Sequence, residues 1–482
     1  MNWLMISAVV WLSMAGCDSS SGPQEAIVPA RQPDVLIVVL DTVRADMVST
    51  YGYRNPTTPQ LDAVGEAGVI FDDVTTPGSW TWPSHASLFT GVGPWEHGAH
   101  ASVAAKGVGL AGGHWGLLGL RPELTTLADR FSAAGYRTVS LASNRFLDKK
   151  LGLTRGFEIT ETMQDRELSA RATELLNETD DRPLFMFVNI LLAHAPWEVY
   201  PVPWSMRHTE RLKAAETVPD WTTPFLMNDT PGLDLGVFPP GASQGGFRQL
   251  MSGELVVPEQ DMEMVEDLYT GGIKAADFLL NKILERWTAT RPSGIVAVTS
   301  DHGEYLGEHG LWDHGKTIFN QVTRVPLVIA APGRLPKGKR VSTPVQMHDL
   351  HDTVLDLAGI DGPKTQSLLP VVEGKPRNGP ILAKSWASRA WLETMGGRFV
   401  YDWTLYREGD LALISSSGGH RQLFNLATDR DMMKDLAAEQ PEKTAELAAK
   451  ADKAFPQATS TSDGVEMSKE IEAELQALGY LE

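Results

Sequence analysis

The sequence of 482 residues predicts an α/β fold with a mostly parallel central sheet and a smaller C-terminal α+β subdomain. Three apolar runs, at 34–40, 183–190 and 294–300, each lead to a side chain that can bind a metal ion. Segments with helical apolar spacing separate these runs, as in the βαβ units of parallel sheets. Because open α/β sheets hold their ligands at the carboxyl ends of the strands, these runs also predict a site at one sheet edge.

Further strands and helices follow the same alternation along the chain. Runs rich in β-branched residues predict additional strands at 69–74, 136–143 and 325–330. Apolar residues at helical spacing predict helices at 59–69, 124–135 and 262–287. The first two of these helical segments carry a glycine near the end, where helices commonly stop.

Two stretches depart from this alternation. From about 199 to 260 the pattern gives way to Pro, Trp, Gly and Thr, which predicts a long irregular insertion over the site. After about 380, alternating segments resemble antiparallel strands and precede acidic, Ala-rich helices. We therefore expect a catalytic domain over 34–380 and a C-terminal subdomain over 381–482.

The amino terminus has the pattern of a lipoprotein precursor. Residues 3–16 form an apolar stretch that ends in small residues directly before Cys17. Met14 to Cys17 resemble a bacterial lipobox, which implies a signal peptide at 1–16, lipidation of Cys17 and a polar tether over 17–33. The expected location is the cell envelope, with the catalytic domain outside the cytoplasm and only a lipid anchor in the membrane. The alternative is a buried N-terminal element with an ordinary core cysteine.

The net charge limits the classes of partner, and the cysteine count limits the disulfides and metal sites. The formal net charge is −19, which argues against nucleic acid or an anionic membrane surface as the main partner. Cys17 is the only cysteine, so disulfides within the chain and cysteine metal sites are excluded. An anionic substrate would be repelled by the same acidic surface. A site for such a substrate therefore needs local positive charge, which a divalent cation supplies.

The segment 300–317 is the densest in groups that bind or protonate oxyanions. Asp301 and His302 can reach one ion if the strand ends at this point, and Gly303 permits that break. The same segment holds His309, His314 and Lys316, which could contact an anionic substrate. The alternative is a solvated polar loop with no ligand.

Asp41 extends the predicted metal site. With Asp301 and His302 it supplies two oxygen ligands and one nitrogen ligand, a set that suits Zn or Mn better than Ca, which remains possible. We expect one divalent metal ion, with a second left open. Taken alone, Asp41 could equally be a helix cap or turn residue.

Thr81 is the candidate for the fourth ligand and for the nucleophile. Pro83 and the helix-compatible residues after it place Thr81 near the positive end of a helix dipole, where an oxyanion is stabilised. The alternative is that Thr81 or Ser84 is an ordinary N-cap.

The order of these segments resembles the sulfatase family of the alkaline phosphatase superfamily. The resemblance rests on Asp41, PSHASLFTG at 83–91, HAP at 194–196 and SDHGE at 300–304. It covers about 34 to 380, and LFNLATDRD and the final LQALGYLE also look like sulfatase C-terminal segments. It implies an alkaline phosphatase-like α/β sandwich with a metal at the strand ends.

The chain departs from the sulfatase pattern at the nucleophile. Sulfatases typically carry a cysteine or serine, oxidised to formylglycine, where this chain has Thr81, and an arginine where it has His85. Thr42 replaces a second aspartate, and Asn144 lies near the position of their lysine motif. Because threonine cannot become the aldehyde, the expected chemistry differs from that of a sulfatase.

The site also resembles phosphoethanolamine transferases and lipoteichoic acid synthases, which use a threonine nucleophile on one divalent metal. That resemblance implies metal ligands at Asp41, Thr81, Asp301 and His302, with Thr81 also the nucleophile. His194 and His314 are candidates to stabilise oxygens or protonate the leaving group. The second-tier candidates for substrate contacts are His85, Asn144, His309 and Lys316.

The expected activity is hydrolysis or transfer of a phosphoric ester through a covalent phosphothreonine. The expected substrate is an anionic small-molecule, glycan or lipid-headgroup ester. Two alternatives stay open: a true sulfuric ester hydrolase, and an inactive envelope-anchored binding protein.

Overall fold

The computed structural model describes residues 32–102, 116–214, 219–226, 242–386, 397–455, 464–465 and 471. Residues 33–482 form one compact unit, whose fold is described below. The expected signal peptide at 1–16, Cys17 and all but the last two residues of the tether lie outside the described residues. Within the described ranges, no helix is long and apolar enough to cross a bilayer.

An eight-stranded sheet forms the centre of this unit, in the order β13-β2-β12-β9-β1-β8-β6-β7. β12 runs antiparallel to both of its neighbours, and the other strand pairs in this sheet are parallel. This confirms the predicted α/β class. The strands are β1 (Val35–Leu40), β2 (Val69–Phe71), β6 (Arg137–Ala142), β7 (Ile159–Thr162), β8 (Leu184–Ile190), β9 (Ile295–Thr299), β12 (Leu327–Ala330) and β13 (Lys339–Val341).

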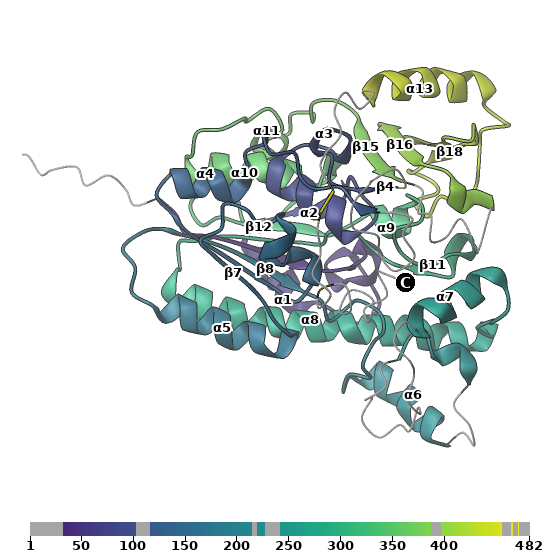
Figure 1. Ribbon diagram of the computed structural model, residues 1–482, viewed down its shortest axis with the longest axis horizontal. Coiled ribbons are helices and arrows are strands. Elements are labelled where there is room, and N and C mark those ends of the chain that lie inside the picture. The colour runs from purple at the N-terminus through teal and green to yellow at the C-terminus, as the bar shows by residue number, and fades with distance from the viewer. Residues whose placement is uncertain are drawn as a thin grey trace, which may run out of the picture. The chain divides into compact units, whose positions relative to one another are not determined.

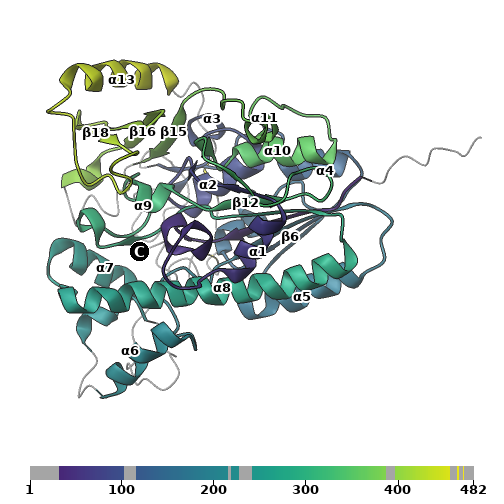
Figure 2. The ribbon, with the colours of Figure 1, turned by 180° about the vertical axis from the view of Figure 1, so that it is seen from behind.

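Helices cover both faces of the sheet (Figures 1 and 2). In β1, Val35, Ile37 and Val39 belong to one apolar core, and the alternate residues belong to the other. This explains why the strand is apolar throughout: both of its faces are buried. The first face packs against α2 (Thr81–Thr90), α4 (Leu127–Ala133) and α10 (Asp349–Ala358), and the second against α1 (Pro59–Ala67), α5 (Asp165–Asn177) and α8 (Met262–Thr290).

A four-stranded antiparallel sheet with α13 (Pro441–Ala454) on one face forms the smaller C-terminal α+β subdomain. Its strands are β15 (Ile381–Ser385), β16 (Trp403–Glu408), β17 (Leu411–Ser416) and β18 (Arg421–Asn425). The other face of this sheet packs against Tyr305, Leu311 and Phe319 of the segment 305–319. The subdomain therefore packs against and supports the segment that carries His314.

Two local predictions were wrong. The run 69–74 is not one strand: β2 ends at Phe71, and β3 (Val74–Thr75) pairs instead with β14 (Val345–Gln346). Asp73 separates them because its carboxylate forms a buried pair with Arg407, at 2.8 and 2.6 Å. The insertion 199–260 is not irregular throughout, since it contains α6 (Pro203–Ala214) and α7 (Ala242–Ser252).

Short elements complete the α-helices and strands of the described chain. They are α3 (Pro94–His97), α9 (Asn320–Thr323), α11 (Leu369–Val372), β4 (Ala101–Ser102), β5 (Gly116–Leu117), β10 (Tyr305–Leu306) and β11 (Trp312–Asp313).

Candidate active site and metal centre

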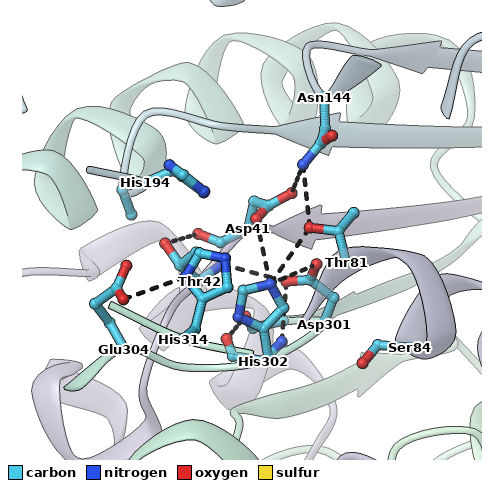
Figure 3. Close-up of polar contacts among 12 residues, drawn as sticks. Asp41, Thr42, Thr81, Ser84, Asn144, His194, Asp301, His302, Glu304 and His314 are labelled. Carbon is cyan, nitrogen blue, oxygen red and sulfur yellow. Dashed lines mark hydrogen bonds and ion pairs between the residues drawn. The ribbon is translucent and has the colours of Figure 1, made fainter. Parts of the chain in front are cut away.

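Polar side chains from four adjacent strands meet at the carboxyl edge of the central sheet (Figure 3). Asp41 follows β1, Asp301 and His302 follow β9, Asn189 lies near the end of β8, and Asn144 follows β6. All five are buried, with exposed fractions of 0 to 1 %. The strand order places them side by side although they come from distant parts of the sequence.

Thr81 also lies in this cluster, but it belongs to a helix and not to the end of a strand. It is the first residue of α2, and the preceding Trp80 has extended backbone angles, so the chain turns sharply into the helix. Its Oγ1 lies 3.3 Å from Nε2 of His302 and accepts a hydrogen bond from Nδ2 of Asn144 at 3.2 Å. The hydroxyl therefore faces His302 and Asn144, at the positive end of the helix dipole.

The hydrogen bonds of His302 fix its tautomer. Nδ1 lies 2.9 Å from the carbonyl oxygen of Gly303, and because a carbonyl only accepts, Nδ1 must carry the proton. Burial lowers the pKa of His302 to about 4, so the ring is neutral near pH 7. The lone pair of Nε2 therefore faces the cluster, in the state in which histidine binds a metal.

Two carboxylate oxygens share the space in front of this lone pair. Oδ1 of Asp41 lies 3.8 Å and Oδ2 of Asp301 lies 3.3 Å from Nε2 of His302. Both oxygens are buried and have no hydrogen-bond donor among the described residues. Burial and the nearby Asp301 carboxylate raise the pKa of Asp41 well above its ordinary value.

The carboxylate oxygens of Asp41 and Asp301 and Nε2 of His302 favour a cation between them, because buried anionic oxygens are costly without a partner. The ligand atoms of Asp41, Asp301 and His302 lie within 4.8 Å of one another. The residues therefore fit a single cation, with Thr81 Oγ1 at its side. The two oxygens and one nitrogen match the donor set expected for Zn or Mn.

Backbone geometry at two positions holds the ligands in place. Thr42 has a positive φ of 60°, an uncommon conformation for a β-branched residue, and its N–H donates to Oδ1 of Asp301 at 3.2 Å. A Cβ on Gly303 would lie 2.1 Å from the carbonyl oxygen of Gln321. The predicted break after His302 therefore requires glycine for close backbone approach.

A second buried cluster flanks the first. His314 places Nδ1 3.2 Å from Oε1 of Glu304 and 3.0 Å from Oδ1 of Asp313, and Lys316 lies 2.6 Å from the other Asp313 oxygen. Burial alone would lower the pKa of His314, but the carboxylates of Asp313 and Glu304 outweigh it and raise the pKa to about 10. His314 is therefore a cation near pH 7, 4.4 Å from the His302 ring between centroids.

Two further predicted site residues lie close by. The His194 ring is 5.0 Å from the His314 ring, and burial with the His314 charge lowers its pKa to about 3. The ring of His85 lies behind Thr81: its Nδ1 donates to the Thr81 carbonyl at 3.0 Å, and it packs against Phe187. These contacts suit His85 to holding Thr81 rather than meeting a substrate.

Two residues expected to contact the substrate have other neighbours. Lys316 donates to Asp313 and to the His314 carbonyl at 2.9 Å. His309 stacks on Phe319 with ring centroids 3.9 Å apart and lines a separate cavity beside the C-terminal sheet. The sequence alone could not separate His309 from His314, since five residues of loop can turn a side chain to either side.

The sequence analysis missed three residues of the site. Asn189 donates to Oδ2 of Asp41 at 2.9 Å, and Glu304 and Asp313 hold His314. Asn189 offered one signal, because it is the polar residue within the otherwise apolar run 184–190. Glu304 and Asp313 lie in the segment already singled out, but nothing in its pattern distinguished them from solvated acids.

A hydroxyl, carboxylates and imidazoles at the carboxyl edge of an α/β sheet are groups that can carry out ester hydrolysis. The family model for sulfatases matches residues 33–360. The chain belongs to the sulfatase family of the alkaline phosphatase superfamily, and is a sulfatase-like ester hydrolase.

Individual relatives are distant but cover most of the chain. A Delta 4,5-hexuronate-2-O-sulfatase of Bacteroides thetaiotaomicron is 23 % identical over 454 residues, covering 88 % of this chain and 90 % of its own. The solved structure of a 2-O GAG sulfatase has a TM-score of 0.67 at 18 % identity and covers 92 % of this chain and 96 % of its own. A phosphonate monoester hydrolase of Agrobacterium radiobacter has a TM-score of 0.64 at 19 % identity, with 88 % and 95 % covered. These structures share the alkaline phosphatase-like fold.

Proposed function

We propose that the protein hydrolyses phosphoric esters, or transfers their phosphoryl group, through a covalent intermediate on Thr81. The observation that supports this proposal most directly is the position of the Thr81 hydroxyl. It lies at the N-terminus of α2, and its Oγ1 is 3.3 Å from the unprotonated Nε2 of His302. A hydroxyl in this position is suited to attack at phosphorus. A divalent cation held by Asp41, Asp301, His302 and Thr81 would lower the pKa of that hydroxyl and neutralise phosphoryl charge.

Asn144, His314 and His194 have proposed roles that follow from their contacts and protonation states. The Asn144 amide donates to Oγ1 of Thr81 and to Oδ2 of Asp41, at 3.2 and 2.9 Å, and so orients both groups. His314 is the cation that faces the cluster, and we assign it the proton for the leaving group. Neutral His194, beside it, can contact a non-bridging oxygen.

In the first step Oγ1 of Thr81 forms a bond to phosphorus as the bond to the leaving oxygen breaks. The hydroxyl proton passes to solvent, and the leaving alcohol takes a proton from His314. In the second step water attacks phosphorus and gives one proton to His314, the bond to Thr81 breaks, and the leaving Oγ1 of Thr81 takes a proton from solvent, which restores its hydroxyl. An acceptor alcohol in place of this water would give transfer instead of hydrolysis.

Sulfuric ester hydrolysis is the second candidate. The relatives named sulfatases favour it, including the 2-O GAG sulfatase. Against it, Thr81 has no route to the aldehyde hydrate that expels sulfate in the formylglycine enzymes. An inactive binding protein is less favoured, because the side chains that fit a cation and the candidate nucleophile lie together in one buried cluster.

The substrate is proposed to be an anionic ester of a small molecule, glycan or lipid headgroup. The phosphonate monoester hydrolases among the structural neighbours make phosphonate monoesters a reasonable addition to the phosphoric esters. Zn or Mn is the proposed metal, with Ca less suited to the nitrogen ligand.

The proposed location is outside the cytoplasm, with Cys17 lipidated after cleavage at residue 16. The apolar stretch before Cys17 and the polar stretch after it support this proposal. Labelling of the expressed full chain with a fatty-acid analogue tests it. Incorporation should disappear in Cys17→Ser, and equal incorporation into both proteins would contradict the proposal.

The function is tested by stripping metal from the purified protein, reloading Zn, Mn or Ca, and comparing matched nitrophenyl esters. The panel is sulfate, phosphate monoester, phosphodiester and phosphonate monoester. Metal-dependent cleavage of the phosphorus esters well above sulfate supports the proposal, as does a phosphoryl adduct on Thr81 in the intact mass. Dominant sulfate cleavage would overturn it in favour of the second candidate.

A further inference from the structure

We infer that Phe225, from the insertion 199–260, is a positioning residue that sets the places of His194 and His314 in the Thr81 site. Phe225 is fully buried and follows the short helical turn Asp220–Thr222. Its ring packs against two tryptophans, each of which lies close in sequence to one of the two histidines. Phe225 therefore acts through these neighbours and not on the substrate.

The first of these neighbours is Trp197, three residues after His194. The rings of Phe225 and Trp197 are stacked, with centroids 5.7 Å apart and an interplanar angle of 6°. The backbone N–H of Trp197 donates to the Phe225 carbonyl at 2.6 Å, and its indole N–H donates to the Ala193 carbonyl at 2.9 Å. The indole bond closes the loop across His194, so a shift of Phe225 would be passed to the His194 ring.

The second neighbour is Trp312, two residues before His314. Its ring lies 5.3 Å from the Phe225 ring between centroids, at an interplanar angle of 55°. Trp312 and Asp313 form the two-residue strand β11, and Oδ1 of Asp313 lies 3.0 Å from Nδ1 of His314. Because packed interiors transmit displacements, a tilt of Trp312 would move the carboxylate that holds His314.

Other parts of the insertion hold the Phe225 ring. The rings of Trp221 and of Phe247, in α7, lie 6.3 and 5.6 Å from it between centroids, and both residues are buried. The helix α7 also contacts β11 (Figure 1). Aromatic clusters of this kind have defined ring orientations. The insertion and the two histidine loops therefore pack as one unit, which gives the insertion a role in the chemistry of the site.

The test is a double-mutant cycle between Phe225→Leu and His314→Asn in the full chain. Phe225→Leu keeps an apolar side chain but removes the flat ring. We expect it to lower kcat about tenfold for an alkyl phosphodiester and no more than about twofold for a nitrophenyl ester, which needs little protonation of its leaving group. In the His314→Asn background the same change should cost no more than about twofold, because the displaced group is already absent.

Phe131→Leu is the matched control. Phe131 is also fully buried and stacked, on Phe185 at 4.2 Å between centroids, but it belongs to the core on the opposite face of the sheet. It should leave both rates within about twofold of the parent. Equal losses in Phe131→Leu and Phe225→Leu would overturn the inference, as would an unchanged kcat in Phe225→Leu or a full loss that persists beside His314→Asn.

A second measurement needs no turnover. Long-range nitrogen–proton spectra of the histidine rings, assigned with His194→Asn and His314→Asn, should show the signals of both rings moved by Phe225→Leu and unmoved by Phe131→Leu. Unmoved signals in Phe225→Leu would overturn the inference. The effect on kcat rests on the proposed function, because it uses His314 as the proton donor. If the parent cleaved only sulfate esters, the phosphoryl chemistry would fail, while the ring signals would still decide the role of Phe225.

Discussion

The side-chain amide of Asn189 donates to Oδ2 of Asp41 at 2.9 Å and so leaves Oδ1 of Asp41 facing His302. Its carbonyl oxygen accepts the backbone N–H of Asn144 at 3.1 Å, which positions the other amide on the same carboxylate oxygen. One neutral side chain in a buried strand therefore orients both a proposed metal ligand and a proposed substrate-site residue. Such support of a ligand is common in metal sites.

Replacement of Asn189 by alanine should weaken metal binding about tenfold or more, because Asp41 loses the donor that orients it. The measurement is the dissociation constant for Zn or Mn by chelator competition, which does not depend on turnover. Asn281→Ala is the matched control, since the Asn281 amide bonds only an exposed Glu285 in the described structure. An unchanged metal affinity in Asn189→Ala would refute the positioning role.

Thr81→Ala should lower turnover of the preferred ester at least about a thousandfold at saturating metal, while the unfolding temperature stays close to the parent value and Asp41, Asp301 and His302 still bind the metal. Ser84→Ala is the control, because Ser84 lies on the same helical turn but its hydroxyl accepts from Thr76 instead of facing the cluster. Retained turnover by Thr81→Ala, or equal loss in both variants, would remove Thr81 as the nucleophile.

His314→Asn should reduce kcat about a hundredfold for an alkyl phosphodiester and much less for a nitrophenyl ester, which needs little protonation of its leaving group. His309→Asn should leave both rates within roughly twofold, since His309 lies against Phe319 in the separate cavity. Paired kinetics on the two substrates make this comparison. A uniform loss on both esters would assign His314 to binding rather than to proton transfer.

Gly303→Ala should destabilise the fold by about 3 kcal/mol or more, because the new Cβ would lie 2.1 Å from a backbone oxygen of Gln321. Gly245→Ala, in α7, meets nothing within 4 Å and should stabilise the fold by up to about 1 kcal/mol, because alanine has a higher helix propensity than glycine. Urea unfolding of both variants measures the difference. Equal stabilities would show that the loop after His302 moves aside at little cost.

Acid should destabilise the protein in part through His97. Burial lowers its pKa from 6.5 to about 3, so the unfolded chain takes up a proton at a pH where the native state does not. Stability is therefore complete above pH 6.5 and falls as the pH drops toward 3, by about 1.4 kcal/mol from this group at pH 5.5. His97→Gln should lack this component, so its stability relative to the parent should improve on acidification. Parallel stability curves between pH 7 and 5.5 would contradict the assignment.

Much of the fold and part of the site follow from local pattern. β1 is apolar at every position because both sheet faces are buried, and this made its strand and the site at its end predictable. The prediction of one strand over 69–74 was wrong because the local sequence does not show that Asp73 pairs with Arg407, which is 334 positions away. Asp313 offered no signal in the sequence, and Asn189 offered only its polar side chain within an apolar run, since the roles of both residues depend on which side chains the fold brings opposite them.

The sequence by itself determined the α/β class, the family and the side chains available for chemistry, because periodicity and motif order are properties of the chain. Only the tertiary structure decided which of those side chains meet. The strand order brings Asp301, Asp41, Asn189 and Asn144 to neighbouring positions, and the loop after β9 turns His314 toward His302 and His309 toward the C-terminal sheet. Distances between residues far apart in sequence arise from packing of the whole core, which local spacing does not encode.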